Sequence, residues 1–98
     1  MAAITKGRVW VTDEKEVKEL LSRGFGEETE GKLLLSAEET TFLKEKRKAF
    51  PTHSGAKELD FGGLMKEFAR HDKEFPRKYI VYRDLRNRGY VIKTGLWA

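Results

Sequence analysis

The sequence predicts an α+β fold, with a small N-terminal domain of about three helices and a mainly antiparallel sheet over residues 1–75. Residues 76–98 are expected to add one helix and one strand of an incomplete second domain. Short β-branched and aromatic runs alternate with longer segments whose apolar residues recur at helical spacing. A chain of 98 residues with 39% apolar and 11% aromatic residues can form one compact core, but not two.

The first expected elements are a strand over residues 7–12 and a helix that follows it. Residues 7–12 read Gly-Arg-Val-Trp-Val-Thr, a composition typical of strands. Asp13 can accept hydrogen bonds from the first helical turn, and Glu16 stands at the capping-box spacing. Gly24 is expected to end this helix because glycine enters the left-handed region without penalty. The apolar stripe of the helix consists of Val17, Leu20 and Leu21.

A loop is expected over residues 24–31, and a second strand and helix after it. Residues 31–36 are apolar on both faces, which predicts a buried strand. Ser36 and Glu39 repeat the capping-box spacing and predict a helix that runs to about Lys48.

The rest of the chain is expected to contain two more helices and a last strand. Residues 50–55 are rich in turn formers and predict a connection. Asp60 is expected to cap a third helix, whose buried stripe is Leu64, Met65, Phe68 and Ala69. Pro76 opens the last helix, Gly89 ends it, and residues 90–97 read as a strand that needs a neighbour.

The positive charge of the chain is concentrated near its end. Residues 1–75 have a net charge of −1, whereas residues 76–98 have a net charge of +5. A local basic segment with interleaved aromatic residues is one way to bind nucleic acid, through phosphate contacts and base stacking. The residues predicted to bind nucleic acid are Arg83, Arg86 and Lys93.

A structural alternative for the same segment is favoured by the residues alone. Tyr79, Tyr82 and Leu85 recur at helical spacing, and aromatic residues on helices are more often core than stacking platforms. The arginines would then frame that core. Asp84 and Arg88 lie four residues apart, a spacing that predicts an ion pair on the helix.

Several function classes are excluded or disfavoured by composition. The absence of cysteine excludes disulfides and thiolate zinc sites, and no apolar run approaches the length of a membrane span. His53 and His71 have no further His at ligand spacing, so we expect surface roles for both, with no metal and no cofactor. The sequence contains no recognisable set of a nucleophile, a base and an orienting group. The cytoplasm is the expected compartment.

Residues 75–95 carry a specific resemblance to a known family. They contain the pattern Tyr-x-Val-Tyr-Arg-Asp-Leu-Arg-x-Arg-Gly-Tyr-x-x-Lys-x-Gly, beginning at Tyr79. This pattern resembles the opening of the catalytic domain of the archaeal tRNA-splicing (tRNA-intron) endonucleases. Upstream, Gly-Phe-Gly at 24–26 and the segment 31–39 are similar to the N-terminal domain of the same family. The resemblance therefore covers nearly the whole chain.

The resemblance implies a role in removing introns from precursor tRNA. Family members cut bulge-helix-bulge RNA without a metal, and their catalytic Tyr, His and Lys follow a Gly-Leu pair that matches residues 95–96 here. None of the three catalytic positions is present, and Tyr82, Tyr90, His53 and His71 do not occupy them. The chain is therefore predicted to have no nuclease activity alone.

Three explanations fit this pattern. The favoured one is a non-catalytic structural subunit in a hetero-oligomer, expected as a heterotetramer, with a longer catalytic paralogue and precursor tRNA as partners. Its segment 90–97 could then add a strand to the sheet of the partner. The alternatives are an N-terminal fragment of a full-length catalytic subunit, and a stand-alone RNA-binding module.

Overall fold

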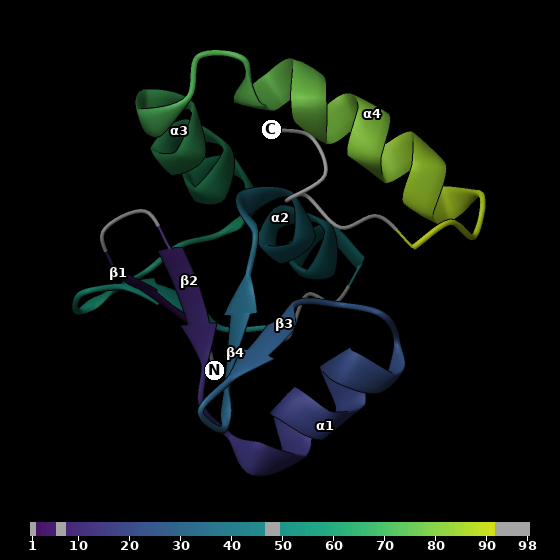
Figure 1. The fold of residues 1–98 in the computed structure, drawn as a ribbon. Coiled ribbons are helices and arrows are strands. Elements are labelled where there is room, and N and C mark those ends of the chain that lie inside the picture. Colours follow the sequence, from purple (N-terminus) through teal and green to yellow (C-terminus); the bar gives the residue numbers. More distant parts are fainter. Residues whose placement is uncertain (1, 6–7, 47–49, 92–98) are drawn as a thin grey trace.

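The computed structural model describes residues 2–5, 8–46 and 50–91, and these residues form a mixed sheet covered by helices (Figure 1). This confirms the predicted α+β class. The strands are β1 (Ala2–Thr5), β2 (Arg8–Val11), β3 (Glu27–Thr29), β4 (Lys32–Leu35), β5 (Thr52–Ser54) and β6 (Lys57–Glu58). The helices are α1 (Glu14–Ser22), α2 (Ala37–Lys46), α3 (Phe61–His71) and α4 (Phe75–Asn87).

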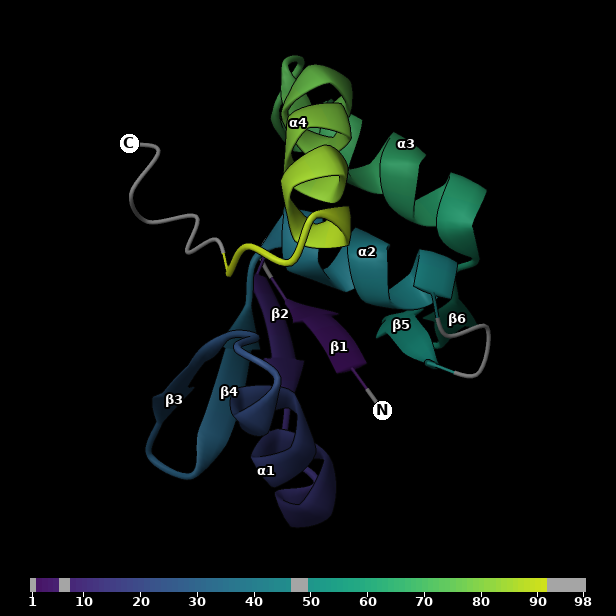
Figure 2. The ribbon, with the colours of Figure 1, turned by 90° about the vertical axis from the view of Figure 1, so that its right-hand side faces the viewer.

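The sheet has the strand order β3-β4-β2-β1-β5-β6, and each adjacent pair is antiparallel except β1 with β5. Val9 lies opposite Leu35 and Val11 opposite Leu33, so these four side chains point to one face, where all are buried. Val17 and Leu20 of α1 join the same buried cluster. In Figure 1 and Figure 2, α2 lies between the strands and helices α3 and α4, and α1 lies at the opposite end of the molecule.

The predicted helix starts are confirmed by their caps. The Asp13 carboxylate accepts from the backbone N–H of Lys15, and the Asp60 carboxylate accepts from that of Gly63 at 2.7 Å. Ser36 and Glu39 form the reciprocal capping box, with both hydrogen bonds at 3.0 Å. The second carboxylate oxygen of Glu39, a residue only 3% exposed, accepts from the Gly26 N–H at 2.8 Å. This carboxylate therefore ties the α1–β3 connection to the start of α2.

Four short strands were not expected from the sequence. The predicted loop over residues 24–31 contains β3, and the predicted connection over 50–55 contains β5, with β6 just beyond it. Strand β1 was also missed. Each has only two to four residues, a run too short for apolar alternation to identify a strand. Strand β3 is fully exposed at the sheet edge, so it lacks the apolar alternation that identifies a strand.

Helix α4 begins at Phe75, with Pro76 in its first turn as expected, and it lies against α2 and α3 (Figure 1). Its residues Phe75, Tyr79 and Tyr82 belong to the same hydrophobic core as the sheet. The Tyr82 ring meets Phe42 of α2 edge-on, with ring centres 5.9 Å apart. The boundary expected between residues 75 and 76 stays a prediction.

The last predicted strand, over residues 90–97, falls mostly outside the described residues. Tyr90 and Val91 are described and are not in a strand. Within the described part of the chain, none of the helices combines the length and the apolar character that a membrane crossing requires.

Candidate functional site

The tyrosines of the basic segment form part of the core rather than an exposed stacking platform. Tyr79 is 1% exposed and Tyr82 is fully buried. The Tyr79 hydroxyl donates to the Glu45 carboxylate of α2, whereas the Tyr82 hydroxyl has no hydrogen-bond partner among the described residues. Burial raises the pKa of both phenols, and the nearby Glu45 and Glu39 carboxylates raise them further. Neither tyrosine is therefore suited to act as a base or nucleophile at neutral pH.

Two of the predicted nucleic-acid-binding residues, Arg83 and Arg86, contact the protein itself. Arg83 pairs with Glu45 at 3.5 Å, and its guanidinium lies 5.7 Å from the centre of the Tyr79 ring. Arg86 lies 3.9 Å from the centre of the Phe25 ring and donates to the carbonyl of Arg23 at 3.2 Å. Both arginines thus frame the aromatic core, as in the structural alternative. The third predicted residue, Lys93, lies outside the described residues.

The remaining cations of this segment each have a carboxylate partner. Lys78 pairs with Asp72 at 2.9 Å, and this bond lowers the pKa of Asp72 and raises that of Lys78. The predicted pair of Arg88 with Asp84 is confirmed at 3.3 Å. Arg77 pairs with Glu74 at 3.2 Å. The described basic segment is therefore largely neutralised within the fold.

The same segment carries an exposed apolar surface that the helical spacing did not predict as a site. Among the described residues, the exposed large hydrophobic side chains are Ile80, Val81, Tyr90 and Val91, which we call the apolar strip. Each is between 43% and 59% exposed. The side chain of Val91 lies close to Gly24, where an added Cβ atom would be only 2.9 Å from Val91 Cγ1. The signal available in the sequence was that positions 80 and 81 fall outside the spacing of the buried tyrosines.

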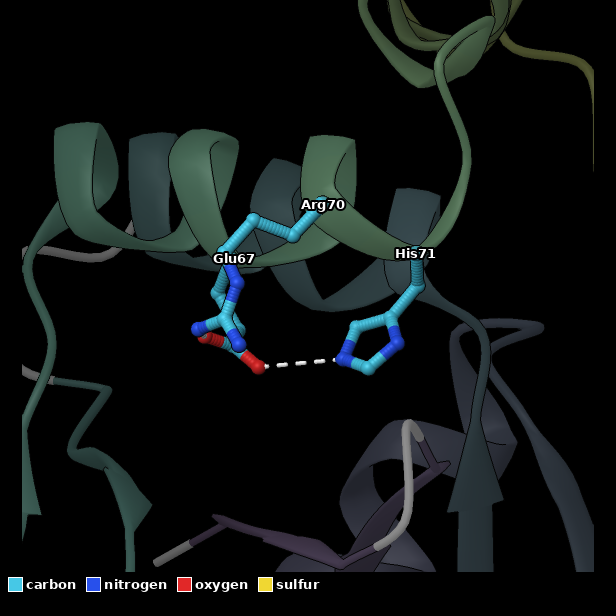
Figure 3. A network of polar contacts seen from close by, with 3 residues as sticks. All are labelled: Glu67, Arg70 and His71. Carbon is cyan, nitrogen blue, oxygen red and sulfur yellow. Dashed lines mark hydrogen bonds and ion pairs between the residues drawn. The ribbon is translucent and has the colours of Figure 1, made fainter.

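The two histidines lie on different elements and do not converge. His71 Nε2 is 3.2 Å from Glu67, which also pairs with Arg70 at 3.0 Å (Figure 3). His71 is 54% exposed, in agreement with the expected surface role. His53 of β5 lies 3.7 Å from Glu58 and is 27% exposed. Among the described residues, no three His, Asp or Glu side chains come together as metal ligands.

These features define a small α+β domain whose described residues gather no catalytic set, and whose last helix presents the apolar strip. The sequence matches the model of the tRNA intron endonuclease N-terminal domain over residues 2–65. The chain therefore belongs to the tRNA intron endonuclease family, as the resemblance at residues 75–95 also indicated.

Relatives with curated names agree with this assignment. The chain is 44% identical over 90 residues to the tRNA-splicing endonuclease of Pyrococcus horikoshii, a match that covers 91% of this chain and 52% of the relative. It is 42% identical to that of Thermococcus gammatolerans, over 91% of this chain and 53% of the relative. The enzyme of Methanococcoides burtonii is 36% identical over 97% of this chain, but only 27% of the relative. The chain thus spans about half, or less, of the length of these relatives.

Proposed function

We propose that the protein is a non-catalytic structural subunit of a tRNA-splicing endonuclease, which removes introns from precursor tRNA at bulge-helix-bulge sites together with a catalytic partner chain. The observation that carries this proposal is the match to the family along 91% of the chain but only about half of the first relatives. These relatives are about twice as long as the matched region, and in the proposed complex the partner chain supplies the rest of the enzyme.

The chemistry of the described residues favours a non-catalytic role for this chain. Metal-free cleavage of RNA by attack of a 2′-hydroxyl needs a base for that hydroxyl and an acid for the leaving oxygen, both within reach of one phosphate. Tyr79 and Tyr82 are buried with raised pKa values, and His53 and His71 lie on separate elements with their own carboxylates. The described side chains therefore do not place an acid and a base around a common point.

The test is to purify the protein from its own cells through a small N-terminal tag and to weigh it by native and denaturing mass spectrometry. We expect the 11.4 kDa chain to co-purify with a second chain whose sequence contains the catalytic Tyr, His and Lys. The purified complex should excise an intron from a bulge-helix-bulge precursor tRNA, and the 11.4 kDa chain alone should not. Intron excision by the pure chain, abolished by a substitution within it, would refute the proposal.

Two further outcomes separate the alternatives. A denatured chain heavier than 11.4 kDa would identify the sequence as the first part of a longer protein, whose continuation would then hold the catalytic residues. An 11.4 kDa chain that binds precursor tRNA without any protein partner would instead identify an RNA-binding module.

A further inference from the structure

We propose that the apolar strip, Ile80, Val81, Tyr90 and Val91, is the surface on which the catalytic partner chain docks. This inference rests on the proposed function and adds the location of the interface. The described surface exposes its large hydrophobic side chains only here, over twelve residues at the end of the described chain. Large apolar side chains that are exposed within one short segment of a highly charged chain mark that segment as a candidate protein contact site.

The charges around the strip favour a protein over RNA as its occupant. RNA binding requires cations that are available to neutralise phosphates. Each cation of α4 and its C-terminal cap already contacts a carboxylate, an aromatic ring or a carbonyl within the fold; these are Arg77, Lys78, Arg83, Arg86 and Arg88. Three of the four side chains of the strip, Ile80, Val81 and Val91, are aliphatic and cannot stack on bases; only the exposed ring of Tyr90 could. An occupant that buries the three aliphatic side chains needs an apolar surface of its own.

The inner side of α4 attaches the helical part of the strip, Ile80 and Val81, to the domain. Tyr79 bonds to Glu45 of α2, and Arg86 is anchored on Phe25 and the Arg23 carbonyl beyond α1. These contacts attach the helix at its middle and near its C-terminal end to two different parts of the domain. A surface held in this way loses little conformational freedom on binding, which favours a specific contact.

The greater length of the relatives indicates which class of partner the strip would bind. In those from Pyrococcus and Thermococcus, about half of the chain lies outside the matched region. The matched family model is that of an N-terminal domain and ends at residue 65, and the strip follows this region in the chain. In a complex of separate subunits, the equivalent domain belongs to the catalytic partner, and the strip is the described surface that it can bury against this chain.

Because the chain has no cysteine, a single introduced thiol reports on one position. We would prepare Ile80→Cys in the strip and Lys18→Cys on α1 as the control, since both side chains are more than half exposed. Maleimide labelling rates would be measured on the isolated chain and on its complex with the co-purified catalytic subunit. With the subunit at about ten times its dissociation constant, labelling at position 80 should slow about tenfold, whereas labelling at position 18 should not change.

The outcomes separate this inference from the proposed function. Equal labelling at position 80 in the isolated chain and in an active complex overturns the docking site and leaves the subunit assignment intact. Slow labelling in the isolated chain that speeds up on dilution identifies a second copy as the occupant. Protection by precursor tRNA alone identifies RNA, and protection within a single heavier chain identifies the continuation of that chain. Each of these three results overturns the inference, and failure to recover any catalytic subunit overturns the proposed function itself.

Discussion

The two faces of α4 carry large apolar side chains with opposite burial. On the inner face, Tyr79 and Tyr82 are at most 1% exposed and pack against α2. On the outer face, Ile80 is 56% and Val81 43% exposed, although they are the immediate neighbours of the buried pair in sequence. The inner face explains how the helix is held to the domain. Ile80 and Val81 lie outside the buried core cluster, and the docking of a partner chain, as proposed above, would account for their apolar character.

The largest expected effect comes from truncating the inner face. Tyr82→Ala removes a fully buried ring that packs against Phe42, and should lower the free energy of unfolding by about 3–5 kcal/mol. Tyr90→Ala, in the strip, should change it by less than about 0.5 kcal/mol. Urea unfolding followed by circular dichroism measures both. Similar losses in the two variants of the isolated chain would contradict the distinction between the buried tyrosine of α4 and the exposed tyrosine just beyond the helix.

A second prediction concerns the outer face in the complex. Ile80→Lys combined with Val81→Lys places two charges where a partner would bury aliphatic groups, and should weaken the complex by about 2 kcal/mol or more. The isolated double variant should unfold within about 0.5 kcal/mol of the unmodified chain. The matched control is Thr29→Lys with Ala56→Lys, two exposed positions on β3 and beside β5.

The lysine variant also distinguishes protein from RNA by the sign of its effect. Added cations strengthen binding to phosphates and make it more dependent on salt. A strip that contacts RNA should therefore bind precursor tRNA more tightly after the double substitution. A strip that contacts the catalytic subunit should lose the subunit in size-exclusion chromatography. Tighter RNA binding with an unchanged complex would contradict the docking site.

The two terminal arginines of α4 offer a third, smaller contrast. Arg86→Ala removes the contact with the Phe25 ring and the bond to the Arg23 carbonyl, and should cost about 1–2 kcal/mol of stability. Arg88→Ala removes only an exposed pair with Asp84 and should cost about 0–0.5 kcal/mol. Thermal and urea unfolding provide the comparison. If Arg86→Ala leaves stability unchanged but weakens tRNA binding and its salt dependence, the earlier assignment of Arg86 to nucleic acid would hold instead.

How well the sequence predicted each feature depends on how far apart in the chain the interacting residues lie. Caps at Asp13, Ser36 and Asp60 are set by residues two or three positions away, and all three were predictable. The buried spacing of Tyr79 and Tyr82 and the pair of Asp84 with Arg88 are also local. Sequence periodicity at 3.6 residues per turn is sufficient for each of these features.

One missed feature is local: strand β3 pairs with β4 across a two-residue turn, but its three exposed residues lack apolar alternation. Other missed features depend on distant partners. Strand β5 lies beside β1 from the start of the chain. Glu45 receives Tyr79 and Arg83 across more than thirty residues of sequence. Such contacts leave no local periodicity. The apolar strip was missed for the opposite reason, since isolated aliphatic residues on an exposed helix face resemble ordinary surface until the packing is known.

The smallest predicted effect lies at the border between the two faces, where Glu38 of α2 faces Lys78 of α4. Burial raises the pKa of Glu38 above its usual value of 4.5, and Lys78 offsets only part of this shift. The folded state therefore binds its proton more tightly than the unfolded state, so this group lowers stability as the pH rises through and above the usual value. Asp72 acts in the opposite sense, because its pKa is lowered by Lys78 and its contribution is lost as the pH falls.

Comparison with Glu38→Gln isolates the contribution of Glu38 to stability. Asp72 is present in both proteins, so its contribution largely cancels in the difference. The stability of the unmodified chain minus that of the variant should decrease as the pH rises through and above the usual carboxyl pKa of 4.5, and then level off. Urea unfolding at several pH values measures this difference. A difference that instead increases with pH would mean that Lys78, rather than burial, dominates at Glu38. The contact between α2 and α4 would then be held by an ion pair at its border as well as by the aromatic inner face.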